Sequence, residues 1–447
     1  MKKFARIVLI VLAVMAAIWF LLFTPVDRSP YDQSDFYREM DKRLDSLEKA
    51  FHEVERSDSL LVGWSKVSIT PAGPAPLAGY SNRKPKEMER LHDSIFVRTV
   101  VFRQGENKVA FVSADLLIFH PAVTDKIIKT LPEGFSTHEL YLTTTHTHSS
   151  LGAWAPGLVG EAIAGPENDT TAQFIADQVI LSIKEAGKQL VRGQIGLVEM
   201  NLEQLVHNRL VHEEGTTDPW LKSVLVHRAG QTGILNFFSA HATCLNSQWR
   251  CLSGDFPGQL NSLLEADTLY DFTLYGAGAV GSMGPVAPGE GWERVEKYAH
   301  QLKKQMDFLP MIVSFSDITS LTSFHLPLPL REPYVKITEN WAIRPYIFKK
   351  LAGDYNVNIS VFKLGSTLFV GIPADFSGEL AVPLYQKARE LGLNLVITSF
   401  NGGYIGYVVK DDWYDLSRYE SRSMSWYGPD NGAYLSEIIE RILHIVS

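Results

Sequence analysis

Apolar runs of β-strand type that alternate with helical patterns constrain the fold of this chain more than any other feature. The runs VGWSKVSITP, FVRTVVF and VAFVSADLLIF are rich in β-branched and aromatic residues, and the last two are separated by a turn at Gly105. Apolar residues then follow helical spacing over residues 121–131 and from about 170 to 190. Further strands are expected at 196–200, 221–228 and 233–240. The alternation predicts an α/β fold with a mixed β-sheet flanked by helices.

Side chains that can bind a metal stand where four of the apolar runs stop. His146 and His148 end the run ELYLTTTHTH, and on a β-strand residues two apart share a face, so both imidazoles should point the same way. The other three runs end in His241, in Asp375, and in Tyr404 and Tyr407. Ligands collect beyond the carboxyl ends of strands in open α/β sheets, so we expect the catalytic groups there. Imidazole with carboxylate suits zinc.

Each of these residues also has a purely structural interpretation. His241 alone is typical of a hydrogen-bonded histidine at a strand edge. Asp375 precedes the helical pattern FSGELAVPLYQKARELG and can cap that helix. Tyr407 alone is typical of a packed aromatic residue with its hydroxyl paired. The shared position at strand ends is what favours a common site.

The N-terminus predicts a membrane anchor over residues 1–27. MKKFAR carries three positive charges ahead of an uninterrupted apolar run from 7 to 23, long enough to cross a hydrocarbon core with help from its flanks. The charges should remain cytoplasmic, which sends the rest of the chain outward. A cleaved signal peptide is the alternative, but FTPVDRSP offers no cleavage site of the small-x-small type. We therefore expect an uncleaved anchor.

Residues 28–60 are expected to form a linker and an amphipathic helix, and residues 61–447 the folded body. Apolar residues in the second segment recur at steps of three and four: Phe36, Met40, Leu44, Leu47, Phe51 and Val54. Such a helix packs on the body or forms a stalk.

Charge and cysteine content exclude several classes of protein. The 447 residues carry a net charge of −8 without a basic patch, which argues against a nucleic-acid partner. Cys244 and Cys251 are too few for a disulfide-dense scaffold or a multi-cysteine zinc site. A single bridge between them remains open.

The glycine pattern GAGAVG at 276–281 is similar to a dinucleotide-binding motif. In such a motif the glycines lead into a helix whose N-terminus holds the pyrophosphate. Met283, Gly284, Pro285 and Pro288 prevent that helix here. A cofactor-dependent oxidoreductase is therefore disfavoured.

Several segments, in order, resemble the neutral/alkaline non-lysosomal ceramidases, zinc amidohydrolases that cleave the N-acyl bond of ceramide. The segments are THTHSSLGAW, ILNFFSAHATCLNSQWRCLSGD, GIPADFSGE, FNGGYIGYVVKDDWYDLSRYES and WYGP. The resemblance covers about 61–434 and is weak between about 291 and 367. It implies zinc as cofactor, with the ligands His146, His241, Asp375 and Tyr407. It also implies that His148 lies beside a metal-bound water as general base, and that Tyr419 binds the developing oxyanion.

The sequence departs from the family pattern at three places. Asp375 stands where better-known members have the longer glutamate. The segment YGAGAVGSMGP replaces a GDVSP-like turn, so that Ala279 takes the place of the aspartate and Gly281 aligns with the serine. Ser282 follows one residue later and is our candidate for the catalytic serine, although Gly281 remains the direct match. Because the sequence ends at Ser447, we also expect the C-terminal β-sandwich domain of the secreted ceramidases to be lacking.

The resemblance implies hydrolysis of the N-acyl amide bond of ceramide, or of a related lipid-like N-acyl substrate, by metal-activated water. Two alternatives stay open: a zinc hydrolase of another amide or ester, and a membrane-tethered binding protein without catalysis. An apolar loop at 152–168 is a candidate wall for an acyl chain, or else a disordered cover. The short Lys/Arg-led anchor suits a bacterial inner membrane with the body in the periplasm.

Overall fold

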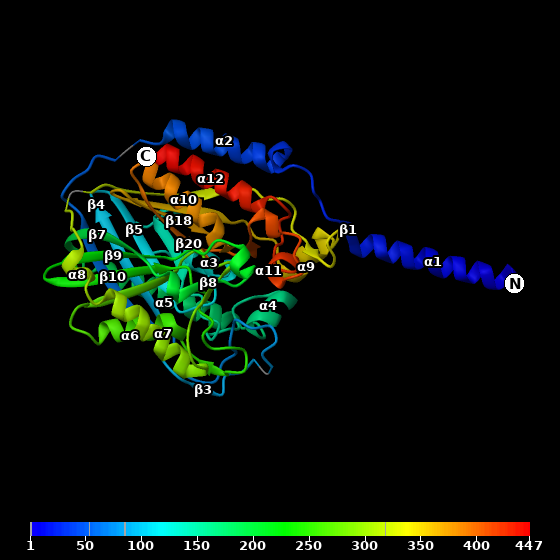
Figure 1. The fold of residues 1–447 in the computed structure, drawn as a ribbon, viewed down its shortest axis with the longest axis horizontal. Helices are drawn as coiled ribbons and strands as arrows, with labels where there is room; N and C mark the ends of the chain where they lie inside the picture. Colours follow the sequence, from blue (N-terminus) through cyan, green and yellow to red (C-terminus); the bar gives the residue numbers. More distant parts are fainter. Residues whose placement is uncertain (1, 53, 85, 318) are drawn as a thin grey trace.

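Two β-sheets packed face to face occupy the centre of the molecule, with helices on both outer sides (Figure 1). The computed structural model describes residues 2–52, 54–84, 86–317 and 319–447. The layers confirm the predicted α/β fold with a mixed sheet flanked by helices.

The larger sheet contains eight strands, and its two edges approach each other. In spatial order the strands are β12 (Phe272–Ala277), β10 (Gln231–Phe238), β9 (Trp220–Arg228), β7 (Val191–Asn201), β2 (Leu61–Ser68), β4 (Phe96–Gln104), β5 (Asn107–Ala114) and β6 (Leu140–Thr144). Neighbours are antiparallel except for the parallel pairs β10/β12 and β5/β6. The edge strands β6 and β12 contact each other, so the sheet is strongly curved.

The smaller sheet packs inside that curve. Its order is β14 (Leu321–Pro327), β17 (Asn358–Leu364), β18 (Thr367–Ile372) and β20 (Asn394–Ser399), with β18 and β20 parallel. Aromatic rings join the two sheets: Phe111 lies 5.3 Å from Phe369, and Phe102 lies 5.5 Å from Phe362, between ring centroids. Strand β20 also contacts β6 and β12. The carboxyl ends of strands from both sheets are therefore brought to one place.

Helices cover the outer faces of both sheets. On the larger sheet lie α3 (Pro121–Lys129), α5 (Asp169–Gly187), α6 (Asp255–Glu265) and α7 (Gly291–Met306), and on the smaller sheet α10 (Gly378–Glu390), α12 (Asn431–Val446) and α2 (Asp35–Ala50). Helix α2 is the predicted amphipathic helix. It is capped by Ser34, buries Met40 and Leu44, and packs against α12, which favours the packed arrangement over a stalk.

Shorter elements complete the body. The remaining helices are α4 (Gly157–Ala164), α8 (Leu309–Ile312), α9 (Pro345–Ala352) and α11 (Tyr419–Arg422). Six of the remaining strands form three pairs: β11 (Cys251–Leu252) with β3 (Arg90–Leu91), β13 (Met283–Pro285) with β8 (Val206–Asn208), and β19 (Asp375–Phe376) with β21 (Tyr407–Val408). A small three-stranded sheet has the order β1 (Phe23–Pro25), β16 (Trp341–Ile343), β15 (Val335–Lys336). The GAGAVG glycines lead into β13 rather than a helix, as the prolines predict. Cys244 and Cys251 are free, buried thiols.

Helix α1 (Lys2–Leu22) projects from the body at the side of α9 and α4 (Figure 1). Its span Lys3–Leu22 has a mean hydropathy of 2.7 and none of it is buried against the body. By length and composition the helix can cross a membrane. A signal sequence near an N-terminus has the same properties, so both readings of this segment fit the helix.

Candidate metal centre

The histidines of THTH lie in a turn after strand β6 rather than on the strand itself. Strand β6 ends at Thr144, and His146 has a left-handed backbone with φ of 58°. The prediction that both imidazoles extend from one strand face is therefore wrong. Phe400, which follows β20 with φ of 65°, stacks on the His146 ring at 3.8 Å between centroids. Two strained backbone positions thus hold one imidazole in a fixed orientation.

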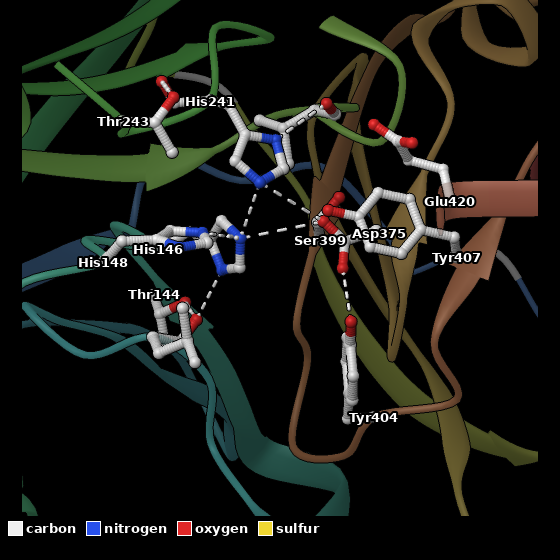
Figure 2. Close-up of polar contacts among 12 residues, drawn as sticks. Thr144, His146, His148, His241, Thr243, Asp375, Ser399, Tyr404, Tyr407 and Glu420 are labelled. Carbon is white, nitrogen blue, oxygen red and sulfur yellow. Dashed lines mark hydrogen bonds and ion pairs between the residues drawn. The ribbon is translucent and has the colours of Figure 1, made fainter. Parts of the chain in front are cut away.

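Three imidazoles nevertheless meet at one point (Figure 2). The Nε2 atom of His146 lies 2.9 Å from Nε2 of His241 and 3.1 Å from Nε2 of His148. His241 comes from the loop after β10 and is fully buried. The convergence follows from the curved sheet, which brings the end of β6 next to β12, the parallel neighbour of the strand β10 that precedes His241.

Hydrogen bonds to the backbone fix the protonation of two of these rings. His146 Nδ1 lies 2.6 Å from the Leu117 carbonyl oxygen, and His241 Nδ1 lies 3.1 Å from the Val280 carbonyl oxygen. Since a carbonyl only accepts, each Nδ1 carries the proton and donates it. Burial lowers the pKa of His146 to about 3 and that of His241 well below its ordinary value, so both rings are neutral at pH 7. Their Nε2 lone pairs therefore face each other.

Asp375 adds a carboxylate to the same space. Its Oδ1 lies 3.7 Å from His146 Nε2 and 3.6 Å from His241 Nε2, and it finds no hydrogen-bond donor among the described residues. Oδ2 accepts a bond of 2.6 Å from the Tyr404 hydroxyl. Burial raises the pKa of Asp375 to about 7, against the Tyr404 hydrogen bond, the positive charge of Arg209 and the nearby Tyr407 hydroxyl. The alternative role as helix cap is wrong, because Ser377 caps α10.

These groups can hold a metal ion. Two facing lone pairs at 2.9 Å repel each other, and a buried carboxylate oxygen without a donor carries a large desolvation cost. A cation among them removes both penalties at once. Two imidazole nitrogens with a carboxylate oxygen are a donor set that zinc accepts.

Two tyrosines and an arginine form the opposite side of the site. Strand pairing sets Tyr407 directly across from Asp375, with its ring parallel to that of His241. Arg209 donates from its Nη2 atom to the hydroxyls of Tyr407 and Tyr419, at 2.9 Å each. Its Nε atom lies 3.6 Å from Glu420. Sequence reasoning missed Arg209, because an arginine just after the short strand β8 carries no spacing signal.

Ser282 lies behind the site rather than in it. The residue is buried, and its hydroxyl lies 2.5 Å from that of Ser377. Gly281, the direct match to the family serine, donates its N–H to the Phe376 carbonyl, and a Cβ there would lie 2.4 Å from the Asp375 carbonyl oxygen. The segment therefore supports the Asp375 backbone, and Gly281 has no room for a side chain.

The SGD motif holds the loops that carry the histidines. Asp255 accepts hydrogen bonds from the backbone N–H groups of Cys244 and Leu245, just after His241. The Thr147 hydroxyl, between the two THTH histidines, donates to the Ser253 carbonyl at 2.8 Å. One short segment therefore positions both histidine loops.

A mostly apolar cavity of about 400 Å³ opens onto these groups. Its wall includes His146, His148, Arg209, Asp375, Tyr404, Tyr407 and Tyr419, with Leu117, Ile118, Ile163 and Met424. A second apolar cavity shares Ile118, Ile163 and Tyr404 with the first, so the two lie side by side. The structure thus brings every sequence-predicted site residue except Ser282 to one cavity or, for the buried His241, directly behind it.

Comparison with known proteins finds ceramidases both by sequence and by fold. The family model for neutral/alkaline non-lysosomal ceramidase, N-terminal, matches residues 60–284. The neutral ceramidases of Drosophila pseudoobscura pseudoobscura and Drosophila melanogaster are each 26% identical over 227 residues, 46% of this chain and 32% of theirs. The matched region therefore spans about a third of the length of these curated relatives.

Solved structures extend the likeness over most of the chain. The crystal structure of neutral ceramidase from Pseudomonas aeruginosa superposes with a TM-score of 0.76 at 19% identity, covering 87% of this chain and 74% of that one. A ceramidase complexed with C2 gives 0.73 at 17% identity, covering 85% and 74%. At these identities the similarity establishes the fold.

The close contact between Gly281 and the Asp375 backbone can be tested by adding a side chain at position 281. A Gly281→Ala substitution should push the Asp375 backbone aside, lowering the free energy of unfolding by about 1–3 kcal/mol and weakening metal binding. Gly187→Ala, at the end of α5 with no atom within 4 Å of the added Cβ, is the matched control and should be neutral. Thermal unfolding and metal titration measure both effects. Equal behaviour of the two variants would contradict the close contact.

Proposed function

The chain belongs to the neutral/alkaline non-lysosomal ceramidase family, and on that premise we propose that it is a zinc-dependent hydrolase. Its substrate is the N-acyl amide bond of ceramide or of a related N-acylated lipid. The observation that carries the proposal is the pair of facing imidazole lone pairs beside an unpaired, buried carboxylate oxygen, at the base of an apolar cavity.

We assign the metal to His146, His241, Asp375 and Tyr407. The Nδ1–H bonds to Leu117 and Val280 orient the two rings, as partners of metal-binding histidines commonly do. A bound zinc ion supplies Lewis acidity toward the amide carbonyl and makes a water molecule acidic near neutral pH. His148 also stands within reach, and a three-histidine set is the competing assignment.

His148 is the proposed general base. Burial lowers its pKa well below the ordinary value, with the neighbouring positive charges acting in the same direction, so the ring is neutral before the reaction and its protonated form would readily give the proton to the leaving amine. Its Nε2 lies beside the Nε2 of His146, and its ring rests 4.8 Å from that of Tyr80. From this position it can take a proton from the attacking water and return it to the leaving amine.

Tyr419 is the proposed donor to the developing oxyanion. Its hydroxyl oxygen accepts a hydrogen bond from Arg209 and lies 3.4 Å from the Tyr407 hydroxyl, so its own proton can be donated either to Tyr407 or into the cavity. Arg209 therefore acts on the substrate through Tyr419. For Ser282 we propose a positioning role, since its hydroxyl contacts Ser377, two residues after Asp375.

The second cavity is the proposed acyl-chain site. The loop that the sequence offered as acyl-chain wall or disordered cover forms helix α4 in this structure and lines the cavity with Trp154 and Val159. Helix α9 supplies Phe348 and Ala352 on the other side. The cavity itself is small, about 60 Å³, so it would take only one section of a long hydrocarbon chain attached to an amide, next to the polar site.

We propose that α1 is retained as an anchor, with the body outside the cytoplasm, as in the periplasm of a bacterium. A cleaved signal sequence would be lost from the mature protein. Here the body bonds to the end of the helix: Arg344 donates to the carbonyl oxygens of Phe20 and Leu22. Strand β1, directly after the helix, pairs with β16. These contacts favour retention.

Release of free amine from ceramide in detergent micelles tests the proposed activity. The full chain, loaded with zinc, should release it, and a His148→Ala variant should lose about 10²–10⁴-fold in kcat while keeping its metal. His444→Ala, at the exposed end of α12, is the control and should match the parent protein.

Two results would count against these assignments. If His148→Ala loses metal together with activity, His148 is a ligand and the base lies elsewhere. If the parent protein releases nothing from ceramide but hydrolyses another N-acyl lipid or an ester, the substrate assignment fails. Tight binding of these lipids without turnover would favour the non-catalytic alternative.

A bulky residue in the second cavity tests the acyl-chain site. Ala352→Trp should fill the space between α9 and α4, because Ala352 lines this cavity and not the first one. We expect kcat/KM to fall at least tenfold for a long-chain N-acyl substrate, a change of about 1.4 kcal/mol, and little for a short-chain one. An equal fall for both chain lengths would contradict the assignment.

A further inference from the structure

The carboxyl end of α1 is bonded to the body at several points, so the fold itself sets the direction of the helix. Arg344 Nε donates to the Phe20 carbonyl at 2.7 Å and Arg344 N–H to the Leu22 carbonyl at 3.0 Å. The Tyr346 hydroxyl donates to the Leu21 carbonyl at 2.7 Å. The β1/β16 pairing begins at the next residue. Strand β1 of the body begins directly after the last residue of α1, so the helix and the body are joined without a linker.

Helix α9, which is bonded to the end of α1, also forms part of the wall of the second cavity. Arg344 is the N-cap of α9, and Phe348 and Ala352, further along the same helix, line the cavity. Helix α4 packs against α9 and supplies the facing wall. Both helices lie on the side of the body from which α1 projects (Figure 1).

This side exposes residues that suit a membrane interface. Leu158 on α4 is 65% exposed and Tyr346 on α9 is 57% exposed. Lys350, one turn after Tyr346, is exposed as well. An exposed leucine with a tyrosine and a lysine is the composition found where a protein meets lipid headgroups. We call Leu158, Tyr346 and Lys350, with the helices that carry them, the α4–α9 surface.

We propose that the α4–α9 surface lies against the same lipid bilayer that α1 spans, so that an acyl chain enters the second cavity directly from the bilayer. The inference rests on the proposed function for its substrate and on the anchor for its orientation. Lipid is the expected occupant, because a helix long and apolar enough to cross a membrane is bonded to this surface.

The length of α1 places the surface at headgroup depth. At 1.5 Å per residue the apolar part, residues 7–22, spans about 24 Å, and the basic residues before it extend the helix to about the thickness of a hydrocarbon core. The end of α1 therefore lies at the boundary of that core. Tyr346 and Arg344 bond to the last residues of the helix, so they lie at the same depth.

A fluorophore at Leu158 measures the docking without any enzyme assay. The full chain is labelled at Leu158→Cys and placed in phosphatidylcholine vesicles in which some lipids carry a nitroxide quencher near the headgroup. Cys244 and Cys251 are buried, so the introduced thiol takes the label. Met311→Cys is the matched control: the residue is 78% exposed and lies on α8, on the far side of the body (Figure 1).

We expect quenching at position 158 at least threefold stronger than at position 311. Lys350→Cys is the second reporter and should behave like Leu158→Cys. Equal quenching at the two faces would overturn the proposal. Because the readout is independent of turnover, a docked but inactive protein would count against the proposed function alone, and an active but undocked one against the docking alone.

Discussion

The repulsion between two buried imidazole nitrogens is the constraint on which the site depends. His146 and His241 each donate the proton on Nδ1 to a backbone carbonyl oxygen. Their Nε2 atoms therefore carry lone pairs, and these two atoms lie 2.9 Å apart. Asp375 brings a carboxylate oxygen to the same point without a donor. A cation at this point would relieve both the repulsion and the desolvation cost, and the left-handed backbone of His146 adds strain at the same place.

The architecture explains how residues far apart in the chain reach that point. The larger sheet curves until its edge strands β6 and β12 touch, and β20 of the smaller sheet contacts both. Loops after these strands and after β10 and β18 therefore share one end of the molecule. The same end carries the second cavity, α9 and the attachment of α1. The candidate metal site, the two apolar cavities and the end of α1 are thus neighbours in one region.

The fold class and most of the site residues could be predicted from the positions of polar residues at strand ends. The turn at His146, the orientation of Ser282 and the role of Arg209 depend on packing between segments that are distant in the sequence. The alternation of strands and helices gave the α/β fold, and the residues His146, His241, Asp375 and Tyr407 do converge. The turn at His146 was missed because a threonine-rich run reads as continuous strand. Ser282 was placed by alignment alone, and packing turns it toward Ser377. Arg209 stands after a three-residue strand whose partner, β13, is distant in sequence, so no pattern marked it.

Whether the full chain holds a metal ion at His146, His241 and Asp375 can be measured by its metal content. The protein should be purified in detergent without chelators and compared with a His241→Ala variant by elemental analysis. The account predicts about one zinc per chain in the parent protein and a loss of most of it in the variant, because a single open site holds one ion. A correctly folded parent protein without metal, or a variant that keeps its full share, would contradict the account.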